Sequence, residues 1–233
     1  MTSGALDDVS TRRLIAAERI ACEGLLEQRV EAGTWVGQLS TSALSTATAT
    51  LAMDLFVRSG GSSGRGEVLR RLVEAGRDWL LGHQNDDGGW GDTELSFSNI
   101  STTMLAHATL TAVAAPEAGA AAEQRTLVLE RAERYIERAG GVDAVLARYG
   151  RDRTFSVPIL THCALAGLVD WRRVIPLPFE LAAVPHRFFK TLRLPVVSYA
   201  LPALIAIGQA QHHHYPSANG IARTMRTLTQ QKT

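Results

Sequence analysis

The sequence has few aromatic residues, few cysteines and almost no net charge. Of its 233 residues, 4 are Trp, 4 Tyr and 6 Phe, and 24 Lys and Arg offset 23 Asp and Glu to a net charge of +1. This balance offers no electrostatic reason to bind nucleic acid, so we expect no such partner. Cys22 and Cys163 are too few and too far apart for a disulfide or zinc framework, which fits a reducing cytoplasm.

The sequence also lacks a convincing membrane span and any motif for a metal or cofactor. Residues 194–208 are broken by two prolines and are shorter than the roughly 20 residues that a span needs. Residues 1–13 are polar, so we expect a polar leader and no signal peptide. The three consecutive histidines 212–214 do not converge on one ion. The glycine-rich residues 60–66 lack the Lys-Ser/Thr of a phosphate-binding loop. We therefore expect no metal and no cofactor.

What the sequence does contain is helical periodicity. Apolar residues from Val68 to Leu80 recur at spacings of three and four, as on the buried face of a helix. No alternating strand pattern of useful length appears, so an all-α fold is predicted. At 45% hydrophobic residues the chain can bury the core of one domain. Helices are expected over 14–29, 41–57, 66–83, 99–114, 122–138, 142–148, 154–167, 178–192 and 196–211.

The most informative stretch is the end of the helix over 66–83 and the turn that follows. Asx residues and glycines at 85–89 allow the chain to reverse. We expect the Gln84 amide to satisfy open carbonyls at the helix end and to lie against Trp90. Neither side chain is a strong acid, base or nucleophile, so the pattern is interpreted as structural. Its members are Gly76, Trp79, Gln84, Gly88 and Trp90.

The same unit recurs along the chain. Residues 25–35 repeat the helix end, the glycine and the tryptophan, with Trp35 in the place of Trp90 and Arg29 in the glutamine register. A third, eroded copy at 134–141 keeps an aromatic and aliphatic pair before two glycines. Paired helices at such a period stack side by side and bury a shared core. The repeat therefore predicts an (α/α) barrel of inner and outer helices.

The pattern of glycine, aromatic, aliphatic, glutamine, glycine and tryptophan resembles the QW repeat of squalene-hopene cyclases and oxidosqualene cyclases. Further segments follow in the order seen at the start of bacterial squalene-hopene cyclases, at 33–37, 140–142, 165–171, 175–181 and 195–202. Since these enzymes have two helical barrels, the resemblance implies that residues 14–211 form the N-terminal barrel plus a first helix that packs with the other barrel. Residues 212–233 are expected to be a tail or the start of a linker.

The resemblance also implies isomerase chemistry in triterpenoid biosynthesis, on a linear isoprenoid such as squalene. In the family this chemistry starts at a strong aspartic acid in a D-x-D-D motif of the second barrel. No D-x-D-D occurs in this sequence, and the acidic residues near the QW turn are interpreted as solvated or capping. We therefore expect no catalytic residue here and no cyclisation without a second barrel, in cis or in trans.

The resemblance also suggests where a substrate cavity would be lined. Carbocation chemistry needs aromatic faces, and few aromatics remain beyond the repeats. His162 falls where squalene-hopene cyclases place a cavity tryptophan, and Ile159 and Gly167 are the other candidates. The alternative for His162 is a core or rim histidine with one satisfied hydrogen bond.

Basic and apolar residues interleave between 171 and 194. Squalene cyclases are monotopic membrane proteins, so the resemblance favours a cytoplasmic protein with a peripheral contact at the inner membrane face. The alternative is that the phenylalanines pack against the partner barrel. The residues concerned are Arg172, Arg173, Arg187, Lys190 and Arg193, with Phe179, Phe188, Phe189, Leu192 and Leu194.

Two function classes stay open at this point. In the first, the chain is the substrate-enclosing N-terminal barrel of a class II triterpene cyclase. In the second, it is a non-catalytic α/α-barrel module that binds a lipid or a protein. Protein prenyltransferase β subunits are also α/α barrels, with a zinc bound by Asp, Cys and His. Cys163 and Asp170 lack the matching context for that zinc site. A D-x-D-D-bearing reading frame next to this one would favour the first class.

Overall fold

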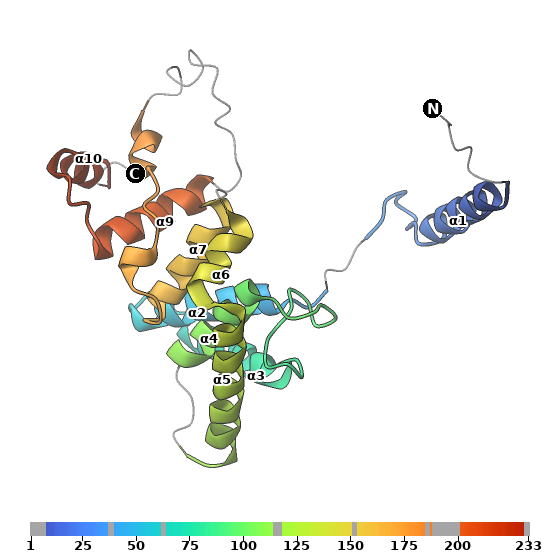
Figure 1. The fold of residues 1–233 in the computed structure, drawn as a ribbon, viewed down its shortest axis with the longest axis horizontal. Coiled ribbons are helices and arrows are strands. Elements are labelled where there is room, and N and C mark those ends of the chain that lie inside the picture. The colour runs from blue at the N-terminus through green and yellow to red at the C-terminus, as the bar shows by residue number, and fades with distance from the viewer. Residues whose placement is uncertain are drawn as a thin grey trace. The chain divides into compact units, whose positions relative to one another are not determined.

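The computed structural model describes residues 8–36, 40–61, 64–113, 118–150, 153–184, 187 and 201–230. By its internal contacts the chain divides into two compact units, Met1–Ser40 and Thr41–Thr233, and each is described by itself. All regular structure in the described ranges is helical, which confirms the predicted all-α fold (Figure 1). None of these helices is long and apolar enough to cross a membrane.

The first unit contains α1 (Asp8–Glu27), and the second contains the remaining elements. Each of the nine expected helical segments contains helical residues in its described part, although several bounds differ. The second unit comprises α2 (Ala43–Arg58), α3 (Gly66–Gly82), α4 (Ile100–Ala112), α5 (Ala120–Ala139), α6 (Gly141–Tyr149), α7 (Arg153–Leu165), the 3-10 helices η1 (Trp171–Arg173) and η2 (Phe179–Ala183), α9 (Leu201–His214) and α10 (Gly220–Gln230).

Helix α4 is the centre of the second unit. Every residue from Ile100 to Leu110 is buried, and the helix packs against α2, α5 and α7. Its ends are satisfied by side chains: the Asn99 carboxamide oxygen accepts from the Thr102 N–H at 3.0 Å, and Arg125 donates to the Leu110 carbonyl at 2.8 Å. A helix buried on all sides is otherwise expected in cores of larger proteins. The small Ser, Thr and Ala side chains of α4 allow its neighbours to approach from several directions.

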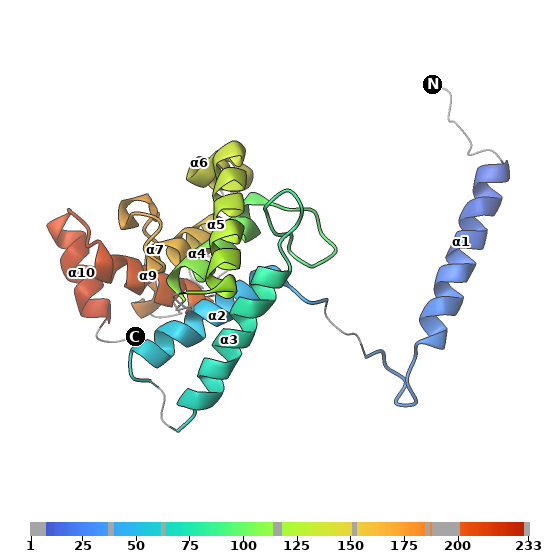
Figure 2. The same ribbon diagram turned by 90° about the horizontal axis from the view of Figure 1, so that it is seen from below.

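Helices α2 and α3 lie side by side (Figure 2). Gly76 of α3 makes this contact possible, because a methyl group added there would lie 2.1 Å from the Thr50 hydroxyl oxygen of α2. By contrast, Gly82 at the end of the same helix has nothing within 4 Å of the equivalent position. The glycine of the QW pattern is therefore a packing requirement between two helices.

The C-terminal region is more ordered than we predicted. Regular structure continues through His214 and resumes in α10, where the sequence suggested a tail or linker. Arg226 of α10 donates to both Glu180 carboxylate oxygens, at 3.1 and 3.2 Å, and its guanidinium lies over the Phe179 ring. This ion pair joins residues that are distant in sequence, so local periodicity gave no sign of it.

Two expectations about the segment from 171 to 194 need correction. Phe179 is buried, so it is not an exposed residue for a membrane or partner; its ring packs where Gly208 leaves space. The expected helix over 178–192 starts as the short 3-10 helix Phe179–Ala183, and Arg187 is helical, while residues 185, 186 and 188–192 lie outside the described residues. Phe188, Phe189, Lys190, Leu192, Arg193 and Leu194 fall outside the described residues.

We expect Gly76→Ala to lower the free energy of unfolding by about 1–3 kcal/mol, because the new methyl group overpacks the contact between α2 and α3. The control Gly82→Ala should be neutral or raise it by about 0.4–1 kcal/mol, because an unhindered alanine restricts the unfolded chain. Chemical denaturation of both variants measures the difference. Equal effects of the two substitutions would contradict the close packing at Gly76.

Candidate functional site

A hydrogen bond from the Trp90 indole joins the QW turn to the end of α3. The indole Nε1 donates to the Leu80 carbonyl at 3.1 Å, and the Trp90 backbone N–H donates to the Thr103 hydroxyl of α4 at 3.0 Å. The tryptophan is 1% exposed. One buried residue therefore caps α3 through its side chain and fixes the position of α4 through its backbone.

Gln84 makes different contacts from those we predicted. Its amide nitrogen donates to the Gly88 carbonyl in the turn and to the Val128 carbonyl of α5, both at 2.9 Å. Neither bond goes to the end of α3, where the Leu80 carbonyl accepts from the Trp90 indole and from the His83 N–H. Gln84 therefore connects the turn to α5 instead of capping its own helix.

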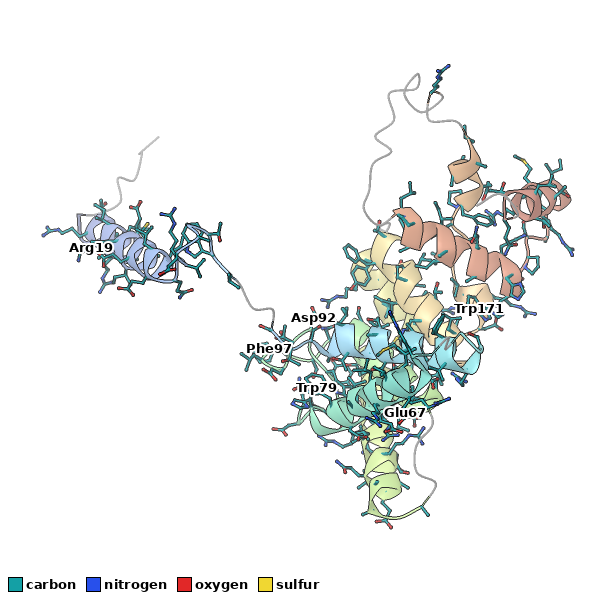
Figure 3. All side chains as sticks on the ribbon, turned by 180° about the vertical axis from the view of Figure 1, so that it is seen from behind. Arg19, Glu67, Trp79, Asp92, Phe97 and Trp171 are labelled. Carbon is teal, nitrogen blue, oxygen red and sulfur yellow. The ribbon has the colours of Figure 1, made fainter. Side chains whose placement is uncertain are left out.

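The turn itself leaves room for no side chain at Gly88. Its φ is +89°, and an added methyl carbon would lie 2.6 Å from the Arg131 carbonyl oxygen of α5. The Asp87 carboxylate accepts from the Gly89 N–H at 3.0 Å and from the Ser98 hydroxyl at 2.7 Å. Asp92, labelled in Figure 3 with Phe97 on the loop before α4, accepts from the Thr102 hydroxyl. These carboxylates therefore hold the turn and the start of α4 in place.

The first unit reproduces this geometry in the register that the sequence indicated. The Trp35 indole donates to the Leu25 carbonyl at 2.6 Å, and Arg29 Nε donates to the Gly33 carbonyl at 2.9 Å. Gly33 has a φ of +77°, in the same left-handed region as Gly88. Arg29 thus makes the local bond that Gln84 makes in the second copy. Trp35 differs in its surroundings, since it is 47% exposed.

The residues proposed to line a substrate cavity lie in or beside the helical core. The Thr109 hydroxyl donates to the Ala47 carbonyl, so it accepts from His162 Nε2 at 3.0 Å. The same N–H also approaches the Leu105 carbonyl at 3.2 Å. Burial lowers the pKa of His162 to about 4. The neutral ring therefore connects α7 to α4 and, through Thr109, to α2.

The other two candidates are not brought together with His162 by any contact that we observe among the described residues. Ile159 is a buried residue of α7. Gly167 has a φ of +81° in the turn after that helix, with open space around it. The role of all three in binding substrate stays a prediction.

The histidines at the end of α9 form an aromatic cluster. The His214 ring stacks on Trp171 of η1 with centroids 4.4 Å apart, and the His213 ring meets it edge to face. His212 instead lies near Phe179. In the part of the chain that the structure describes, no group of three His, Cys, Asp or Glu side chains could hold a metal ion.

Sequence analysis did not identify one polar pair near the core. His107 of α4 and Glu133 of α5 both line a cavity of about 240 Å³. The sequence does show a histidine inside a helix of small residues. It does not show that Glu133, on another helix, is the partner, because the spacing of residues within α4 or within α5 says nothing of contacts between them.

In each of two turns, a tryptophan indole donates to the carbonyl of a helix residue ten positions earlier. This repetition defines a protein of QW-type helical repeats. Comparison with known proteins agrees with this class. The family described as squalene-hopene cyclase N-terminal domain matches residues 19–200. The chain belongs to this family, which confirms the resemblance seen in the sequence.

A relative in the fungus Aspergillus fumigatus, squalene hopane cyclase afumA, is 31% identical to the chain over 162 residues. The aligned part is 66% of this chain and 19% of that protein. The chain therefore matches less than a fifth of the length of this relative. No solved structure matches the chain.

We expect Trp90→Phe to lower the free energy of unfolding by about 1–3 kcal/mol, because the Leu80 carbonyl keeps only its longer bond from His83. The matched control is Trp35→Phe, which removes the equivalent bond from a half-exposed indole. It should change the unfolding of the second unit by less than about 0.5 kcal/mol. Denaturation followed by far-ultraviolet circular dichroism compares the two, and similar losses would refute a special role for Trp90.

His162 should make stability fall as the pH is lowered from 6.5 to about 4. In that range the unfolded state binds a proton that the native state excludes, which costs roughly 3 kcal/mol in total. His162→Gln should lose less stability over the same range than the parent protein. Imidazole carbon shifts measured by NMR give the pKa directly, and a His162 midpoint near 6.5 would show that the ring is not excluded from water.

Proposed function

We propose that the chain forms the N-terminal, substrate-enclosing part of a squalene-hopene cyclase-like class II terpene cyclase. It would bind a linear isoprenoid such as squalene and support its cyclisation together with a D-x-D-D-bearing barrel, supplied in cis or in trans. The observation that carries the proposal is the family match over residues 19–200. The bonded QW turns support it, because they are the local structures that the family pattern demands.

The distribution of acids supports a division of labour. The acidic side chains of the QW turn are held by backbone and hydroxyl donors, as shown for Asp87 and Asp92. Protonation of an alkene requires a carboxylic acid that stays neutral and is poised to donate its proton. The sequence contains no D-x-D-D to supply one. The chemistry that we assign to this chain is therefore enclosure and orientation of the polyprene, while the proton comes from the second barrel.

Helix α1 offers a surface for that second barrel. Leu14, Ile15, Leu25 and Leu26 are exposed, and the two pairs are eleven residues, or about three helical turns, apart, which places them along one seam of the helix. An exposed contiguous apolar face indicates an interaction site. We propose that this seam packs with the acid-bearing barrel. A peripheral contact of the assembled enzyme with the inner membrane face belongs to the same proposal.

The proposal is tested by expressing the 233-residue chain with and without a D-x-D-D-bearing cyclase barrel, in cells that supply squalene. The chain alone should give no cyclic triterpene by gas chromatography, and the pair should give one. A cyclic product from the chain alone would contradict the assignment of the acid to the second barrel. A stable complex without product would favour a non-catalytic binding module.

Two matched substitutions in α1 sharpen this test. Ile15→Asp lies on the apolar seam, whereas Ile20→Asp lies on another side of the helix, and the two isoleucines are 60% and 66% exposed. Ile15→Asp should reduce co-purification with the second barrel, and the yield of product, by roughly tenfold, because a carboxylate must lose water in the contact. Ile20→Asp should have little effect. Equal effects of the two variants would exclude the seam as the contact.

A further inference from the structure

A cavity of about 240 Å³ in the second unit is bounded by α4, α5, the start of α6 and the turn after α7. Its apolar wall comes from Met104, Ile136, Val142 and Val169. The Cys163 side chain also faces it, and its thiol donates to the Met104 carbonyl at 3.7 Å. Burial raises the pKa of this thiol to about 12, so the wall carries no charge there.

A buried nitrogen in this cavity lacks a partner. The His107 side chain is 9% exposed, and its Nε2 has no hydrogen bond to any described residue. Glu133 Oε1 lies 3.5 Å away, which is too long for a good bond. Buried polar atoms in native proteins are nearly always satisfied. Among the described residues four other buried side-chain atoms also lack a hydrogen-bond partner, but His107 Nε2 is the one that borders this cavity, which favours a ligand that supplies the missing hydrogen bond.

The polar groups around this nitrogen favour a cation. Burial lowers the pKa of His107 although the Glu133 carboxylate opposes the shift, so the imidazole is neutral at pH 7 and can accept a hydrogen bond. Glu133 stands at the rim with its side chain 61% exposed. No Lys or Arg is among the residues that line the cavity. The site therefore combines apolar walls, a neutral acceptor and a negative rim.

A second carboxylate, Glu137, also borders the cavity. It faces a neighbouring depression as well, whose other lining residues are three arginines and two aspartates: Arg131, Arg134, Arg138, Asp86 and Asp87. The three arginines exceed the two aspartates by one positive charge, which offsets that of Glu137. Glu133 is therefore the carboxylate that sets the sign of the potential beside His107.

We propose that this cavity binds a small organic ammonium ion. The apolar body of the ligand lies against Met104 and Ile136, and its ammonium group contacts both Glu133 and His107 from the cavity side. One N–H donates to the Glu133 carboxylate and another to His107 Nε2, with the ring proton on Nδ1. Charge-assisted bonds of this kind are about twice as strong as neutral ones. A neutral alcohol of the same shape gains less, and an anion is repelled.

Benzylammonium is the probe that tests this site, with benzyl alcohol as the neutral analogue of similar shape. Each is titrated into the full chain with labelled methyl groups at neutral pH. We expect saturable shifts at Met104 and Ile136, magnetisation transfer from the ring protons of the probe, and affinity for the ammonium at least roughly fivefold above that for the alcohol. Equal affinities, or no saturable shift with either compound, would overturn the proposal.

Glu133→Gln keeps the shape of the rim and removes its charge. It should reduce affinity for benzylammonium by roughly fivefold and leave benzyl alcohol unchanged. The control is Glu130→Gln on the same helix, which is 53% exposed and does not line the cavity, and it should bind both probes like the parent protein. The same loss in both variants would show only general attraction to an acidic surface and would refute the site. If Glu133→Gln failed to fold, the comparison of the two probes on the parent protein would still decide.

Discussion

The hydrogen bond from the Trp90 indole to the Leu80 carbonyl is the contact on which the second unit depends. It ends α3, buries the largest side chain of the turn and, through the bond from the Trp90 backbone to Thr103, fixes the start of α4. Helix α4 is in turn the element that α2, α5 and α7 pack against. Gln84 extends the connection to α5, so the turn fixes three helices by a small number of directed bonds. Directed bonds suit this place because the buried backbone groups of a turn must be satisfied individually.

The first unit separates what is local in this motif from what is not. Arg29 can replace a glutamine because the local requirement is only a donor that reaches the glycine carbonyl four residues on. The indole bond of Trp35 is retained for the same reason. Burial is not retained, since Trp35 is half exposed. A repeat unit can therefore form its own turn, but neighbouring helices must supply its core.

Two histidines show how much of the candidate site was predictable. His162 was identified from its position relative to the family pattern, yet its hydrogen bonds to Thr109 and Leu105 come from a helix far away in sequence. His107 was not identified at all. It lies on the same α4 that holds His162 in place, but its Nε2 is left without a partner. Residue type and spacing do not distinguish a satisfied histidine from an unsatisfied one, because the difference depends on which side chains other helices bring near.

The sequence by itself determined the all-α class, the family and the places where helices give way to glycine turns. It could do so because periodicity, glycine and the tryptophan register act within about ten residues of one another. Tertiary structure alone decided that Gln84 reaches α5, that Phe179 is buried, and that α10 is held by the ion pair between Arg226 and Glu180. It also decided where a cavity remains. These features depend on contacts between residues that are far apart in the chain, and such contacts leave no periodic trace in either segment.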